Sequence, residues 1–104
     1  MITIPFHPRH TERIEEGTKR FTLRLDPGYD PSPGDSLELV DGDRDRITTA
    51  RCRLKAEVPA GWIPEWQFEG HRNYGSFDEL HDELAEYYPD HDIDGDTPIT
   101  VIGW

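Results

Sequence analysis

The chain has 104 residues and a formal net charge of -11, from 22 Asp and Glu against 11 Lys and Arg. This length favours a single domain over residues 1–104. Its 34% hydrophobic residues, with 3 Trp, 4 Tyr and 4 Phe, provide for one compact core and exclude natural disorder. The sequence holds no apolar run of about 18 residues and no signal-peptide pattern at its start, so we expect a cytoplasmic protein without a membrane segment.

The charged residues are of the kinds favoured in a salt-rich cytoplasm. Nine of the 11 cations are Arg, and Asp supplies 12 of the 22 acids. At molar salt the Debye length falls to about 3 Å, so repulsion within an acidic surface is screened, whereas in dilute buffer it opposes the compact state. The composition therefore predicts a halophilic protein. The alternative is an ordinary acidic protein.

The charges are also unevenly distributed along the chain. Residues 1–55 hold ten cations and ten acids, whereas residues 56–104 hold one cation and twelve acids. Because an acidic surface repels anionic ligands, a contact with such a ligand should use the first half. The alternative is that each Arg pairs with a neighbouring acid, an arrangement that is common and adds little stability.

The first half of the chain predicts a short helix and several strands. Pro8 and Gly17 are typical of the start and the end of a helix over residues 8–16, which follows a β-prone entry. Lys19–Leu25 alternates between apolar and polar side chains, which predicts a half-buried strand. Two further strands are expected over Leu37–Val40 and Ile47–Val58. In the longer strand the side chains expected to point inward are those of Ala50, Cys52, Leu54, Ala56 and Val58.

The second half predicts one helix and a closing strand. Ser76-Phe-Asp-Glu is a capping box, and apolar residues recur at helical spacing after it, so we expect a helix over residues 76–88. Its apolar face should hold Phe77, Leu80, Leu84 and Tyr87 or Tyr88, and its solvated acidic face Asp78, Asp82, Glu83 and Glu86. Pro98–Trp104 is predicted as a strand buried on both faces.

These elements together indicate the fold class. About five strands with two peripheral helices, in an order without regular strand–helix alternation, predict an α+β fold built on a small mixed β-barrel. Pro59–Gly70 should be irregular or briefly helical, and packing is the favoured role of its aromatic residues Trp62 and Trp66.

Standard catalytic and metal-binding motifs are missing from the sequence. Cys52 is alone, which excludes an internal disulfide and multi-thiolate zinc sites. Asp90-His-Asp-Ile-Asp-Gly-Asp begins like a calcium loop, but Val101 stands where the twelfth position needs a bidentate Glu. The sequence has no Gly-rich phosphate loop, no Gly-x-Ser-x-Gly and no Cys–His couple. We therefore expect neither a metal nor a cofactor.

One polar cluster remains, in Gly17-Thr-Lys-Arg-Phe-Thr-Leu-Arg. Lys19 becomes a general base near neutral pH if its pKa falls to about 7–8, which burial and neighbouring Arg side chains can cause. It could then deprotonate the Thr22 hydroxyl for attack on an acyl carbon, while Glu69 passes a proton to the leaving amine. Lys19 and Thr22 share a face only if the strand begins after Lys19. The alternative is a strand face of ordinary solvated charges.

Several short motifs follow one another along nearly the whole chain. They are Gly17-x-Lys19-x-x-Thr22-x-Arg24, Pro33-Gly34-Asp35-Ser-Leu-Glu-Leu, Ala50-x-Cys-x-Leu, Glu69-Gly70, Ser76-Phe-Asp-Glu-Leu, Tyr88-Pro89 and Thr97-Pro-Ile-Thr-Val-Ile-Gly-Trp. In this order the set resembles the ASCH domain, the activating-signal-cointegrator homology family. The resemblance implies a PUA-like β-barrel with a cleft that binds RNA or a modified nucleoside.

The resemblance also implies roles for single residues. Some small prokaryotic members of the family are amidohydrolases that deacetylate N4-acetylcytidine with a Lys, a Thr and a Glu. Lys19 and Thr22 stand at the matching places of the Gly-x-Lys-x-x-Thr motif. The acid position of the family can be matched to two residues. The Glu-Gly pair matches it to Glu69, whereas counting back from the helix matches it to Asn73, which has no acidic group.

Three functions follow from these observations. The favoured one is an RNA- or modified-nucleoside-binding domain, with its cleft at the Gly17–Arg24 motif. Its ligand contacts are expected from Arg20, Arg24, Arg51, Arg53 and Tyr74. The second is an N4-acylcytidine amidohydrolase that uses Lys19, Thr22 and Glu69, and the third is an acidic protein-interaction domain. Because phosphate contacts weaken steeply with salt, binding at molar salt should depend on a shaped pocket and on stacking.

The halophile hypothesis predicts that stability depends on salt. Molar KCl should raise the midpoint of thermal unfolding above its value in dilute buffer, because screening reduces the repulsion among 22 acidic side chains. Circular dichroism melts at the two salt concentrations measure this shift. An unchanged midpoint would contradict the hypothesis.

Overall fold

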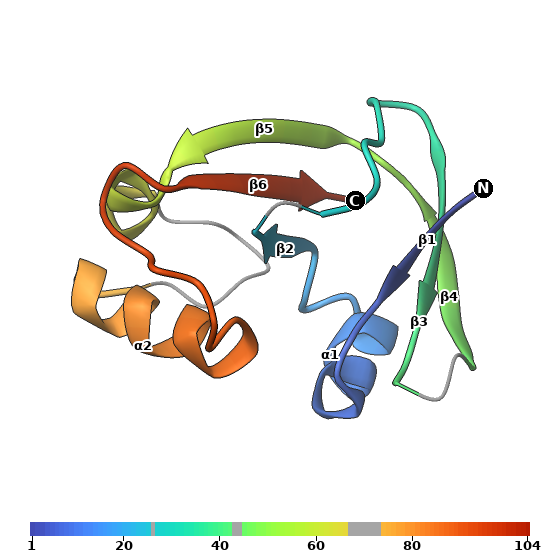
Figure 1. The fold of residues 1–104 in the computed structure, drawn as a ribbon. Helices are drawn as coiled ribbons and strands as arrows, with labels where there is room; N and C mark the ends of the chain where they lie inside the picture. Colours follow the sequence, from blue (N-terminus) through green and yellow to red (C-terminus); the bar gives the residue numbers. More distant parts are fainter. Residues whose placement is uncertain (26, 43–44, 67–73) are drawn as a thin grey trace.

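The computed structural model describes residues 1–25, 27–42, 45–66 and 74–104. Within these ranges the chain forms six strands, two α-helices and two 3-10 helices (Figure 1). In chain order they are β1 (Ile2–Pro5), η1 (Pro8–His10), α1 (Thr11–Glu16), β2 (Phe21–Arg24), β3 (Ser36–Val40), β4 (Arg46–Arg51), β5 (Leu54–Pro59), η2 (Ala60–Glu65), α2 (Phe77–Tyr87) and β6 (Pro98–Gly103).

The strands of this part of the chain pair into two three-stranded sheets. One has the order β1-β3-β4, with β1 parallel and β4 antiparallel to β3. The other has the order β2-β6-β5, with both outer strands antiparallel to β6. The predicted α+β class is confirmed. Closure of the six strands into one barrel stays a prediction, because the pairing recorded among the described residues leaves two sheets.

The long strand predicted over Ile47–Val58 is wrong in one respect, because it is split into β4 and β5. At the break the Cys52 N–H donates to the Asp35 carbonyl at 2.8 Å, and the Arg53 N–H donates to the Gly103 carbonyl at 2.8 Å. Cys52 is thus the last residue bonded next to β3, and Arg53 is the first bonded to the end of β6. The chain passes from one sheet to the other between them. Leu54, predicted to point inward, is 38% exposed at the start of β5.

Strand β6 lies between two hydrophobic cores, which confirms that both its faces are buried. Ile99 and Val101 belong to a cluster with side chains of β5, η2 and α2. Ile102, on the opposite face, belongs to a second cluster with side chains of β1, α1 and β3. Because successive strand residues point to opposite faces, a run of apolar residues is what such a central strand requires.

The predicted end of the first helix and the predicted start of α2 are confirmed, but the helix predicted over residues 8–16 begins as the 3-10 helix η1 and is α-helical only from Thr11. Gly17 ends α1 with a φ of 80°, a left-handed conformation that residues with a Cβ rarely adopt. At the start of α2 the Ser76 hydroxyl accepts from the Glu79 N–H at 3.3 Å, and the Glu79 carboxylate accepts from the Gly75 N–H at 2.6 Å. The side-chain cap at Ser76 is confirmed, whereas Glu79 binds the Gly75 N–H, one residue before the Ser76 N–H that a capping box would use. None of the helices in the described part is both long and apolar enough to span a bilayer.

Gly17→Ala should lower the free energy of unfolding by about 1 kcal/mol, because a Cβ disfavours the left-handed conformation that stops α1. Urea unfolding measures the change. A Cβ at Gly17 meets no atom within 4 Å, so the cost comes from the backbone alone. Gly28→Ala is the matched control, because its Cβ also meets no atom within 4 Å and its φ is not positive. Equal unfolding free energies for the two variants would contradict this account.

Candidate functional site

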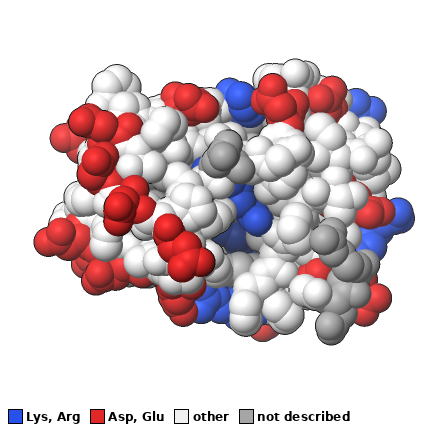
Figure 2. All heavy atoms as spheres, viewed as in Figure 1, with Lys and Arg blue, Asp and Glu red and all other residues white. Residues whose placement is uncertain are grey.

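A cavity of about 460 Å³ opens between residues 5–10, strand β2 and helix α2. This volume lies within the usual range of small-molecule sites. Figure 2, in the orientation of Figure 1, shows a hollow near the centre of this face, with Lys or Arg atoms at its floor and Asp and Glu atoms gathered on its α2 side. The cavity therefore joins the first half of the chain to the acidic second half.

The Gly17–Arg24 motif forms one wall of the cavity. Strand β2 begins at Phe21, so Lys19 lies before the strand, and the condition for it to share a site with Thr22 is met. The Lys19 ammonium donates to the Phe21 carbonyl at 3.0 Å. Thr22 is only 5% exposed. The alternative of a solvated strand face does not hold for Thr22 and Arg24, because the N-terminal segment and α2 lie around them.

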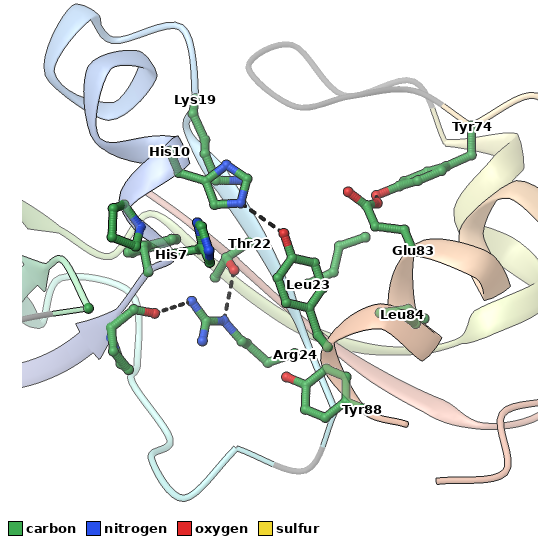
Figure 3. A pocket seen from close by; sticks show the side chains of 15 residues that line it. His7, His10, Lys19, Thr22, Leu23, Arg24, Tyr74, Glu83, Leu84 and Tyr88 are labelled. Atoms are coloured by element: carbon green, nitrogen blue, oxygen red, sulfur yellow. Dashed lines mark hydrogen bonds between the residues drawn. The ribbon is translucent and has the colours of Figure 1, made fainter. Parts of the chain in front are cut away.

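The Arg24 side chain lies along this wall, beside Thr22 (Figure 3). Its Nε donates to the Thr22 hydroxyl at 2.9 Å, and its Nη2 donates to the Pro5 carbonyl at 2.6 Å. The guanidinium carbon lies 4.9 Å from the centre of the Phe6 ring, and the Lys19 ammonium lies 5.9 Å from the same ring. Two cations thus share one aromatic face, which offsets part of the free energy of removing them from water.

Burial changes the acid–base properties of Lys19. Its pKa falls from 10.5 to about 8, mainly because the ammonium is removed from water, and also because Arg24 and Arg13 repel its charge. Glu83 opposes this shift. Lys19 therefore changes protonation state close to neutral pH, as a general base must.

The opposite wall is supplied by α2 and by Tyr74. The Tyr74 hydroxyl donates to the Glu83 carboxylate, and both side chains line the cavity across from Lys19 (Figure 3). The prediction that Glu83 belongs to a solvated acidic face is wrong. Glu83 lies three residues after the buried Leu80, so it stands at the border of the apolar face. That spacing is the signal that could have identified it.

One edge of the cavity is closed by contacts between η1 and α2. The His10 Nε2 lies 3.1 Å from the Tyr87 hydroxyl, which also accepts from the Arg9 guanidinium. Burial is the main cause that lowers the pKa of His10 from 6.5 to about 4, followed by repulsion from Lys19 and other neighbouring cations. His10 is therefore neutral at pH 7. The sequence did not indicate this contact of His10, because its partner, Tyr87, lies 77 residues further along the chain.

The predicted site residues divide into three groups. Lys19, Thr22, Arg24 and Tyr74 line the cavity. Arg20, Arg51 and Arg53 are exposed and do not line it, and the Arg51 side chain donates instead to the Gly34 carbonyl at 3.2 Å. The proposed ligand contacts of these three residues are therefore not part of this cavity. Glu69 and the alternative Asn73 lie outside the described residues.

The packing role predicted for the two tryptophans is confirmed for Trp66 and wrong for Trp62. Trp66 packs against the core cluster of β6 and α2, whereas Trp62 is 58% exposed. Over the described ranges, no group of three or more His, Cys, Asp or Glu side chains is arranged to hold a metal ion.

The fold is similar to those of two solved bacterial structures. An ASCH domain from Lactobacillus crispatus JV V101 superposes with a TM-score of 0.62 at 12% identity, over 89% of this chain and 67% of that chain. A DUF984 protein from Enterococcus faecalis V583 superposes with a TM-score of 0.60 at 17% identity, over 91% of this chain and 67% of that chain. No family model and no curated protein matches the sequence. The chain therefore has an ASCH-like fold.

His10 should make the protein sensitive to acid. Because its pKa is about 4 in the folded state and 6.5 in the unfolded state, the unfolded state binds more protons between these values, and stability falls as pH falls through this window. Urea unfolding at pH 7 and pH 4.5 should show a smaller loss of stability in His10→Asn than in the wild type. His91→Asn, at an exposed position after α2, is the control. Equal losses in the wild type and both variants would refute the role of His10.

Proposed function

We propose that the chain binds a nucleoside of RNA, or a modified nucleoside, in the cavity between β2 and α2. The observation that carries this proposal is the juxtaposition of two cationic side chains, the buried Lys19 and the half-buried Arg24, with the aromatic side chains of Tyr74 and Tyr88 in one cavity. Aromatic rings and guanidinium groups are the surfaces on which proteins stack bases, and cationic donors bind base carbonyls and sugar or phosphate oxygens. The ASCH-like fold supports the same conclusion.

The charge distribution favours one nucleoside over a long stretch of RNA backbone. Arg51, Arg53 and Lys55 occupy alternate positions along the chain, where they could follow a sugar-phosphate backbone, but the two Arg side chains lie outside the cavity, and Lys55 pairs with Asp30 at 2.8 Å. The chain also has a net charge of -11, which repels a polyanion. Affinity in this protein should therefore come from the shape and hydrogen bonds of the cavity, which resist salt better than phosphate contacts do.

Hydrolysis of an N4-acylated cytidine is the second candidate, and the state of Lys19 favours it. With a pKa of about 8, a neutral Lys19 could take the proton of the Thr22 hydroxyl, whose oxygen would attack the acyl carbon. The C–N bond would then break, and the amine would leave with a proton from an acid, the role predicted for Glu69. Water would then hydrolyse the ester and release the acyl group from Thr22. The Arg24 Nε, already 2.9 Å from the Thr22 oxygen, would stabilise its developing negative charge.

Titration calorimetry with cytidine and N4-acetylcytidine in molar KCl tests both candidates. The wild type should bind both, and Lys19→Ala should weaken binding by at least about tenfold, because a charge-assisted hydrogen bond is lost. Arg53→Ala removes one exposed cation outside the cavity and should leave the affinity unchanged.

The same samples are then assayed for release of cytidine from N4-acetylcytidine. Turnover that disappears in Thr22→Ala selects the hydrolase, whereas binding without turnover selects the binding domain. If neither compound binds the wild type, the proposed function is wrong.

A further inference from the structure

Glu83 places a negative group opposite the two cations of the cavity. Its carboxylate accepts from the hydroxyl of Tyr74, a side chain that is only 5% exposed. Figure 3 shows this pair on the α2 side, facing the gap whose other side is formed by Lys19, Thr22 and Arg24. Glu83 also lies near enough to Lys19 to act on the charge of its ammonium. The cavity is therefore polarised from one wall to the other.

The other acidic residues of α2 have different positions. Asp82 is 88% exposed, Glu86 is 62% exposed and lies 3.5 Å from Arg9, and Glu79 caps the start of the helix. Asp78 is exposed in the first turn. Among the described residues, Glu83 is thus the acid of this helix that lines the cavity. Its position cannot be explained as one more charge on a solvated acidic surface.

The polarity of the two walls defines the ligand chemistry. Lys19 and Arg24 only donate hydrogen bonds, whereas a carboxylate only accepts them. Tyr74 directs its proton at Glu83, so it orients the carboxylate and keeps this wall an acceptor. A ligand that spans the cavity must then present an acceptor, such as a carbonyl oxygen, to one wall and an N–H donor to the other. A carbonyl oxygen facing Glu83 would be repelled.

We propose that Glu83, positioned by Tyr74, accepts a hydrogen bond from an exocyclic N–H of the bound base and thereby selects amino-bearing bases over their keto counterparts. This inference rests on the proposed function, because it assigns the specificity of the same cavity. Cytidine and uridine form the discriminating pair: they have nearly the same shape, but where cytosine has an amino donor uracil has a carbonyl acceptor.

The test is the ratio of the dissociation constants of uridine and cytidine, measured by titration calorimetry in molar KCl. The wild type should prefer cytidine by at least about tenfold, the value of one charge-assisted hydrogen bond. Glu83→Gln keeps the size of the side chain but removes the charge and adds a donor, so the ratio should fall to within about threefold of unity. Circular dichroism melts confirm that each variant is folded.

Two further variants separate positioning from a general effect of charge. Tyr74→Phe keeps the ring and removes only the hydroxyl, so it should lower the uridine-to-cytidine ratio while cytidine still binds. Asp82→Asn removes one charge from the adjacent, 88% exposed position and should leave the ratio at the wild-type value.

The outcomes distinguish this inference from the proposed function. If the wild type binds both nucleosides without preference, or if Glu83→Gln keeps the same ratio as Asp82→Asn, the role of Glu83 is refuted while nucleoside binding stands. If the wild type binds neither nucleoside, both the proposed function and the role of Glu83 are refuted.

Discussion

The burial of both faces of β6 is the constraint on which the rest of the structure depends. Ile99 and Val101 on one face and Ile102 on the other connect the two cores, so the strand is held in the interior of the molecule. Strand β2 is bound along β6, and the Trp104 N–H extends the contact by donating to the Arg20 carbonyl at 3.0 Å. Because β2 carries the Gly17–Arg24 motif, this core determines where the cationic wall of the cavity lies.

A buried cation, Lys19, lies beside a half-buried one, Arg24, in an acidic protein, and local contacts offset part of the cost of this arrangement. The ammonium of Lys19 and the guanidinium of Arg24 donate to the carbonyls of Phe21 and Pro5, and both lie over the Phe6 ring. Each hydrogen bond offsets part of the loss of hydration, yet the lowered pKa of Lys19 shows that the charged form is still disfavoured. The Glu83 carboxylate across the cavity acts in the opposite direction and favours the charged form of Lys19.

The functional proposals depend on this polarity more than on the overall charge. A net charge of -11 opposes extended contact with nucleic acid, but it does not prevent a small, uncharged base from entering a cavity with donors on one wall and an acceptor on the other. Specific hydrogen bonds in a partly enclosed cavity also remain effective in concentrated salt, where exposed charge pairs are screened.

The sequence by itself determined the features that depend on a few neighbouring residues. The stop of α1 at Gly17, the side-chain cap at Ser76 and the apolar run of β6 are confirmed, because a backbone conformation, a cap and a run of buried side chains are each encoded locally. The Lys19 and Thr22 pair was found in the same way, from its spacing and its resemblance to a family motif.

Only the tertiary structure decided which distant residues share a wall or a hydrogen bond. The strand predicted over Ile47–Val58 breaks because Cys52 and Arg53 find partners at Asp35 and Gly103, and no periodicity within the strand specifies those partners. Glu83 faces the cavity because Tyr74 binds its carboxylate on the same wall and β2 lies on the opposite one. Such contacts join residues far apart in the chain, and they depend on how the sheets and α2 pack around β6.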